Sequence, residues 1–124
     1  MKKGGDMKIG QVKKAFNVSA YDISDILVGA FEGGSNYWIE KVFVVDNDYK
    51  GGKYASDVIG LGGRLIIKTL DNDTKTLTQE MMVKGIQQYV DEGGKNYPFH
   101  NTQPDSYTYD TILQNALFNE LVYG

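Results

Sequence analysis

Residues 64–77 of the chain are RLIIKTLDNDTKTL, and this stretch decides the class of fold. Arg64 to Leu70 is rich in apolar and β-branched residues, which predicts a strand. Asp71 to Thr74 are turn formers, and Lys75 to Leu77 then predict a second, short strand. Strands joined by so short a turn run antiparallel. The centre of the fold is therefore expected to be an antiparallel sheet.

Two more strands are predicted on the N-terminal side of this stretch. Residues 38–45 form one of them, and its later half, Val42 to Val45, is apolar on both faces. That pattern is typical of a central strand that is covered on both sides. Residues 8–18 form the other strand, since alternate positions share one face. Those positions are Val12, Lys14, Phe16 and Val18.

Each predicted helix begins at a residue whose side chain can cap it. Ser19 precedes the first helix, Thr78 the second, and Asp105 or Ser106 the last. Glycine pairs at residues 33–34 and 93–94 end the first two helices. Residues 54–61 are consistent with one short helical turn. The sequence therefore predicts an α+β fold, with a mainly antiparallel sheet of about four strands and two or three helices packed on one face.

The length of 124 residues suits one domain. We expect residues 7–124 to form a single α+β domain and residues 1–6 to be a disordered leader. Lys2 to Asp6 can be encoded by AAAAAAGGAGGTGAT, which contains a strong bacterial ribosome-binding sequence directly before the codon of Met7. Met7 is then the expected start, and the expected source is a bacterium or its phage.

The composition excludes several classes of function. A net charge of −3 with a single arginine argues against non-specific nucleic-acid binding, which needs clustered basic residues. The absence of cysteine excludes disulfides and Cys-ligated zinc. No apolar run approaches the roughly 18 residues of a membrane span. We therefore expect a protein of the bacterial host cytoplasm that makes no membrane contact.

No motif in the sequence predicts catalysis. The densest glycine cluster, Gly60-x-Gly62-Gly63, precedes a strand and fits no phosphate-loop pattern. Residues 46–57 resemble the start of an EF-hand loop, but Lys50 stands where an oxygen ligand is required. The single histidine, His100, has no nucleophile motif around it. The expectation is a protein that is not an enzyme and needs no metal and no cofactor.

Aromatic residues are the strongest sign of a binding surface, and the same residues also fit a core tryptophan with tyrosines at its rim. Tyrosine and tryptophan combine a large contact area with a hydrogen-bonding group, which suits interfaces and base stacking. One aromatic cluster precedes the strand at residues 38–45, and two tyrosines flank the loop that follows it. The candidate binding residues are Asn36, Tyr37, Trp38, Tyr49, Tyr54 and Arg64.

Three strings carry a resemblance to known proteins: EGGSNYW at residues 32–38, YASD at residues 54–57, and ALFNELVYG at residues 116–124. With them the chain resembles a group of small uncharacterised phage and prophage proteins of Gram-positive bacteria. The likeness covers most of the chain from the first helix onward. Many members have a cysteine where this chain has Ile39, so no thiol role is implied. The resemblance implies a phage or prophage context and assigns no functional residue.

The leading functional hypothesis is a non-enzymatic phage accessory protein that binds a host protein and inhibits a bacterial defence, as anti-CRISPR proteins do. A second hypothesis is a sponge for a nucleotide signal, with the aromatics stacking on the base and Arg64 or loop N–H groups binding phosphate. A third is a structural or assembly component of the phage. Whether the chain forms a homodimer is left open by the sequence.

Overall fold

The computed structural model describes residues 17–94 and 104–124. The leader expected at residues 1–6, most of the strand expected at residues 8–18, and His100 lie outside these ranges. Asn17 and Val18, the last two residues of that expected strand, are described and belong to no strand.

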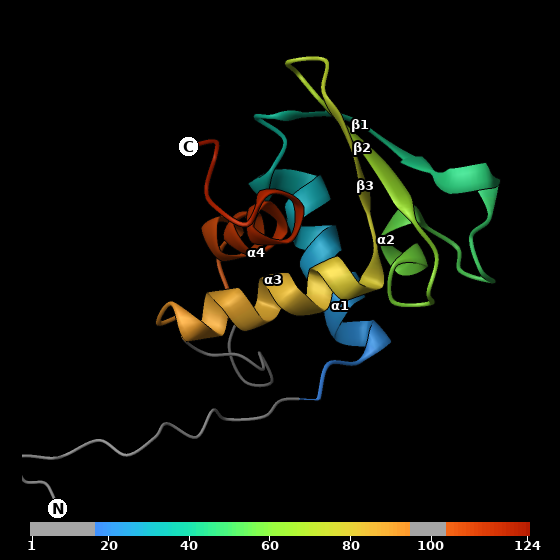
Figure 1. The fold of residues 1–124 in the computed structure, drawn as a ribbon. Helices are drawn as coiled ribbons and strands as arrows, with labels where there is room; N and C mark the ends of the chain where they lie inside the picture. The colour runs from blue at the N-terminus through green and yellow to red at the C-terminus, as the bar shows by residue number, and fades with distance from the viewer. Residues whose placement is uncertain (1–16, 95–103) are drawn as a thin grey trace, which may run out of the picture.

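The described residues form a three-stranded antiparallel sheet and four α-helices, which confirms the α+β class. The elements are, in chain order, α1 (Ala20–Gly29), the π-helical segment η1 (Ala30–Gly34), β1 (Ile39–Val44), the short 3₁₀ segment η2 (Val45–Asn47), α2 (Ala55–Val58), β2 (Leu65–Thr69), β3 (Thr74–Leu77), α3 (Gln79–Asp91) and α4 (Ser106–Phe118). Figure 1 shows α1, α3 and α4 grouped on one side of the sheet. The short helix α2 packs against α1 and β1. Within the described ranges, no helix has the length and apolar character to cross a membrane.

The predicted caps are present at all three long helices. Ser19 accepts a hydrogen bond from the backbone of Asp22, and the Asp22 side chain accepts one from Ser19, which is a complete capping box. Thr78 caps α3 and Asp105 caps α4 in the same way through their side-chain oxygens. Local side-chain chemistry therefore fixes where these helices begin.

The strand order differs from the prediction in one respect. β2 is the central strand and pairs with β1 on one side and β3 on the other. β1 is thus an edge strand of the described sheet and not the central one. Its side chains on one face are exposed, so the prediction that Val42 to Val45 is covered on both sides is wrong. Phe43 faces outward and is 46% exposed. Its ring lies 6.0 Å from the Lys41 ammonium, so a cation next to the ring partly compensates for this apolar exposure.

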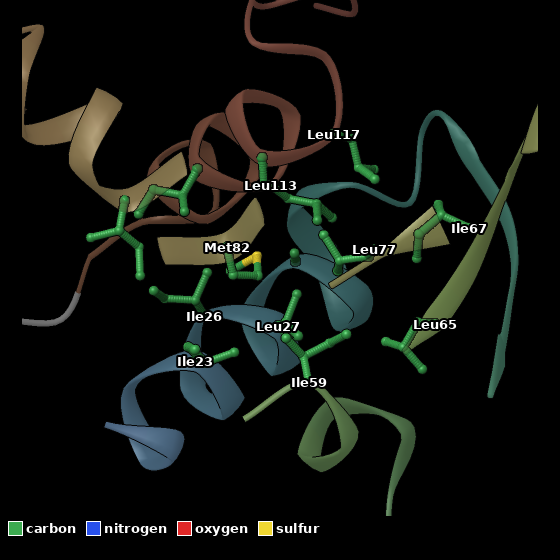
Figure 2. Close-up of a cluster of buried hydrophobic side chains, with 14 of the residues drawn as sticks. Ile23, Ile26, Leu27, Ile59, Leu65, Ile67, Leu77, Met82, Leu113 and Leu117 are labelled. Atoms are coloured by element: carbon green, nitrogen blue, oxygen red, sulfur yellow. The ribbon is translucent and has the colours of Figure 1, made fainter. Parts of the chain in front are cut away.

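The core fills the space between the helices and the inner face of the sheet, as Figure 2 shows. Leu65 and Ile67 of β2 point into it together with Leu77 of β3. The helices contribute the remaining buried aliphatic side chains. These are mainly Ile23, Ile26 and Leu27 of α1, Met82 and Ile86 of α3, and Ile112, Leu113 and Leu117 of α4.

Two glycines allow elements to approach α4 more closely than a side chain would permit. A Cβ on Gly85 of α3 would lie 2.8 Å from the backbone nitrogen of Ala116. A Cβ on Gly34, the last residue of η1, would lie 2.5 Å from the carbonyl oxygen of Ser106. Helix α4 is therefore held between α3 and η1 by backbone contacts, and it is the element on which the candidate site is built.

Candidate protein-binding surface

A buried carboxylate on α4 organises the most elaborate polar network of the described chain. Asp110 is only 4% exposed. Its Oδ1 accepts hydrogen bonds from the Ser35 hydroxyl at 2.8 Å and from the Trp38 indole N–H at 2.7 Å. Its Oδ2 accepts from the Tyr37 hydroxyl at 2.5 Å and from the Gln114 amide at 3.1 Å. Four donors thus satisfy a buried charge that no lysine or arginine of the described chain pairs with.

The turn that supplies three of these donors is fastened at both ends. The backbone N–H of Ser35 donates to the carbonyl of Ala30 at 2.8 Å, which joins the turn to η1. The N–H of Leu70 donates to the carbonyl of Trp38 at 2.9 Å, which joins it to the end of β2. The side chains at residues 35, 37 and 38 are therefore aimed at α4 by the backbone that carries them.

Gln114, one helical turn after Asp110, extends the network to the C-terminal residues. Its Oε1 accepts from the backbone N–H groups of Val122 and Tyr123, both at 2.8 Å. Its Nε2 also reaches the Tyr37 hydroxyl at 3.2 Å and the carbonyl of Tyr123 at 3.2 Å. One side chain thus holds residues 119–124, the C-terminal tail, against the turn at residues 35–38.

Aromatic side chains also pack between the turn at residues 35–38 and the C-terminal tail. The Trp38 indole stacks on the Tyr123 ring with centroids 5.1 Å apart and an interplanar angle of 3°. Phe118, the last residue of α4, packs on both rings at 5.6 Å and 5.9 Å. The Tyr123 hydroxyl donates to Asp71 at 3.0 Å. The tail is therefore fixed by stacking as well as by hydrogen bonds.

Trp38 is 1% exposed, so of the two alternatives it is a core residue, and its inclusion among the candidate binding residues is wrong. The sequence shows an aromatic residue in a polar turn, where exposure is the usual outcome. The indole is buried because its N–H finds a carboxylate on α4 and its ring finds Tyr123, neither of which is near in sequence. Trp38 supports the neighbouring surface from beneath.

What remains exposed above this network is a small surface of aromatic and aliphatic side chains. We call it the Tyr37 surface and define it as Asn36, Tyr37, Tyr107, Leu121 and Val122, all of them exposed. Tyr37 is 50% exposed, since its hydroxyl is engaged while one part of its ring faces solvent. Tyr107 lies one turn before Asp110 on α4, and Leu121 and Val122 belong to the held tail. Four of its five residues are aromatic or aliphatic, and hydrogen bonds hold the turn and the tail that carry most of them.

The Tyr37 phenol keeps its proton unusually strongly. Burial, and then the hydrogen bond and negative charge of Asp110, raise the pKa of Tyr37 from 10.0 to about 12. A raised pKa in the folded state means that the protonated phenol stabilises the fold below pH 10. This contribution is lost as the pH rises through about 12.

We expect a spectroscopic titration to show this directly. The difference between the tyrosinate absorbance of the parent protein and that of Tyr37→Phe should have its midpoint near pH 12. The same subtraction with Tyr123→Phe should give a midpoint above 10.0, because burial and Asp71 raise the pKa of Tyr123 as well. A Tyr37 midpoint at or below the ordinary value would contradict the bond to Asp110.

Tyr123→Ala tests the attachment of the tail. Removing the ring should expose the face of Trp38 to water, shift its fluorescence emission to longer wavelength, and lower the free energy of unfolding by about 2 kcal/mol. Tyr123→Phe is the matched control, since it keeps the stack and removes only the hydroxyl with its bonds to Asp71 and Thr69, at a cost of about 1 kcal/mol. Unchanged Trp38 emission in Tyr123→Ala would show that the tail does not cover the indole.

The other candidate residues lie elsewhere and do not form one site. Tyr49 is half-buried against the core. Tyr54 is exposed and lines a hollow between α1 and α2. Arg64 lines a different, much smaller hollow and lies 4.0 Å from Asp46. Of the six predicted residues, only Asn36, Tyr37 and Trp38 are brought together, and only the first two face solvent.

The loop that resembles an EF-hand has other uses for its carboxylates. Asp48 pairs with Lys50 at 3.0 Å. Asp57 caps α2 by accepting from the backbone N–H groups of Lys53 and Tyr54, which lowers its pKa. Within the two described ranges, no three His, Cys, Asp or Glu side chains are grouped closely enough to hold a metal ion.

Four residues that build the site were not predicted from the sequence: Ser35, Asp110, Gln114 and Tyr123. The signal that could have revealed two of them is their position. Asp110 and Gln114 are four residues apart on α4, so they share a face of a helix whose other buried residues are mostly aliphatic. Buried polar residues need hydrogen-bond partners. In the folded chain these partners are the Ser, Tyr and Trp side chains of the turn at residues 35–38.

Comparison with known proteins adds no assignment. No protein-family model matches the chain, and neither a curated protein nor a solved structure gives a significant match.

Proposed function

We propose that the chain is a non-enzymatic binding protein that contacts another protein through the Tyr37 surface. The resemblance to small phage and prophage proteins supports a phage accessory role. The partner that we propose is a host protein in the bacterial cytoplasm, and the proposed effect is inhibition of a bacterial defence, in the manner of an anti-CRISPR protein.

The observation that carries the proposal is the support beneath this surface. Binding energy in protein interfaces concentrates in a few aromatic and aliphatic side chains, and it is greatest when these are already fixed before binding. The Asp110 network fixes the turn that carries Asn36 and Tyr37. Gln114 fixes the tail that carries Leu121 and Val122. Both segments meet at Tyr37, so the surface loses little conformational entropy when a partner covers it.

Affinity capture from lysate of a Gram-positive host, with the full chain and matched variants, tests the proposal. Val122→Asp and Leu121→Asp place a charge in the surface while leaving the backbone bonds to Gln114 intact. We expect either change to abolish retention of a host protein. Val83→Asp makes the same substitution as Val122→Asp at another exposed site, on α3, and should leave retention unchanged. Equal retention by all four proteins would contradict a role for the Tyr37 surface.

The nucleotide-sponge hypothesis has weaker support. The hollow next to Tyr54 is lined by Val28, Phe31, Glu32, Ala55 and Ser56 besides the tyrosine, so its one charged lining residue is acidic. A phosphate group would be repelled there. Arg64 lies at a hollow of about 70 Å³, which is too small for a nucleotide and also contains Asp46 and Asp48. The stacking and phosphate-binding groups of that hypothesis therefore occupy separate places.

A further inference from the structure

A groove runs along one side of α1, where α1 faces the segment at residues 52–61. Two hollows make up this α1/α2 groove. The larger, of about 440 Å³, lies between Val28, Phe31 and Glu32 on one wall and Tyr54, Ala55 and Ser56 on the other. The smaller, of about 260 Å³, lies between Ala20, Tyr21 and Ser24 on one wall and Gly52, Asp57 and Leu61 on the other.

The two hollows follow one another along the same face of the α1–η1 segment. Tyr21, Ser24, Val28 and Phe31 follow helical spacing and therefore share one face of the α1–η1 segment. The hydroxyl of Ser24 donates to Asp57 at 3.1 Å, which joins the two walls of the smaller hollow. The bridge also fixes the distance between α1 and α2, so the groove is already formed in the free protein.

The groove exposes more apolar surface than a solvated helix face needs. Tyr21, Val28, Tyr54 and Leu61 line it, and all four are large apolar residues that are exposed. Clusters of exposed apolar side chains bordered by polar groups mark places where another molecule binds. None of these four belongs to the Tyr37 surface.

The charge of the groove indicates what kind of molecule fits. Its lining contains two carboxylates, Glu32 and Asp57, and no basic side chain. Asp57 already accepts three hydrogen bonds, whereas Glu32 makes no ion pair with any described residue. Helix α1 and η1 carry no lysine or arginine. The Lys53 ammonium lies 5.4 Å from the Tyr54 ring centroid and therefore already occupies one face of that ring. The lining carboxylate that stays available to a basic partner is that of Glu32.

We propose that the α1/α2 groove binds a basic, apolar segment of a partner polypeptide. Apolar side chains of that segment fill the two hollows, and a lysine or arginine pairs with Glu32. An acidic groove of this kind attracts basic sequences and rejects acidic ones, which gives specificity as well as contact area. The site is separate from the Tyr37 surface and does not depend on the function proposed for it.

Selection from a library of random twelve-residue peptides displayed on phage tests the proposal with the full chain as bait. We expect the enriched peptides to combine at least two large apolar residues with lysine or arginine. Val28→Glu should weaken binding of a synthetic enriched peptide at least about tenfold, because it replaces an apolar wall of the larger hollow with a charged side chain, against which an apolar anchor cannot pack. Glu32→Lys should weaken it several-fold, and the loss should be smaller at high salt, where charge pairs are screened.

Matched variants separate the groove from general effects on folding. Val83→Glu makes the same change as Val28→Glu on the exposed side of α3, and Glu120→Lys makes the same change as Glu32→Lys outside the groove. Both should bind the peptide as the parent protein does. Val122→Asp should also bind the peptide normally. The peptide assay therefore tests the groove proposal alone, and the lysate capture tests the Tyr37 surface.

Three outcomes would overturn the proposal. One is enrichment of acidic or uncharged peptides, or of none. Another is binding that is unaffected by Val28→Glu and Glu32→Lys. The third is self-association that Val28→Glu abolishes, measured by sedimentation velocity; it would assign the groove to a second copy of the chain, whose stretch from Val12 to Phe16 is itself basic and apolar.

Discussion

Asp110→Asn should lower the free energy of unfolding by about 3 kcal/mol, because it leaves buried donors without acceptors. An amide offers one oxygen where the carboxylate offers two, and its nitrogen faces donors. The hydroxyls of Ser35 and Tyr37 can rotate, but the Trp38 indole N–H has a fixed direction. Whichever way the amide turns, its N–H groups face a donor of fixed direction, either the Trp38 indole or the Gln114 amide.

Urea denaturation followed through Trp38 fluorescence measures this effect at its source, since Trp38 is the only tryptophan of the chain and donates directly to Asp110. Glu120→Gln is the matched control, because it makes the same loss of charge at an exposed residue. Its unfolding midpoint should stay close to that of the parent protein. Equal midpoints for Asp110→Asn and the control would show that the network does not contribute to stability.

The neighbouring glycines at residues 33 and 34 should respond to alanine in opposite directions. A Cβ on Gly33 meets nothing within 4 Å. Gly33→Ala should therefore raise the free energy of unfolding by about 0.5 kcal/mol, since it restricts the unfolded chain. A Cβ on Gly34 would lie 2.5 Å from the backbone oxygen of Ser106, which cannot move without shifting the start of α4. Gly34→Ala should cost about 3 kcal/mol by overpacking.

Thermal unfolding of the two variants, measured in parallel, compares their unfolding temperatures. The variants have the same composition and differ by one position in the sequence, so a difference between them reports on the contact with α4. Gly34→Ala should also weaken the binding of a partner to the Tyr37 surface, because a displaced α4 moves Asp110 away from the turn at residues 35–38. If both variants unfold at the same temperature, the close contact between η1 and α4 is not present in solution.

The sequence predicted the helix starts well because the information is local. Ser19, Thr78 and Asp105 each bond to a backbone group three residues away, and a capping residue acts in the same way in almost any fold. The edge position of β1 could not be predicted in this way. A run such as Val42 to Val45 shows only that a strand is apolar, and strand order depends on which segments pair.

The candidate site was predicted only in part, because some of its contacts are local in sequence and others are not. The turn from Asn36 to Trp38 stood out by its aromatic content, and two of its residues do face solvent. The burial of Trp38 depends on Asp110 and Tyr123, whose distance from the turn is set by the whole fold. No property of residues 35–38 alone indicates a buried carboxylate on a helix near the other end of the chain.

The bonds between the turn and Asp110 join residues that are 72 to 75 positions apart. During synthesis the turn therefore leaves the ribosome without its acceptor. At the roughly 5–20 residues per second of translation, α4 follows about 4–15 s later. For that time the Trp38 indole is open to water, to chaperones and to other nascent chains. The surface that we propose for binding is thus completed last, and a chain interrupted before α4 would lack it altogether.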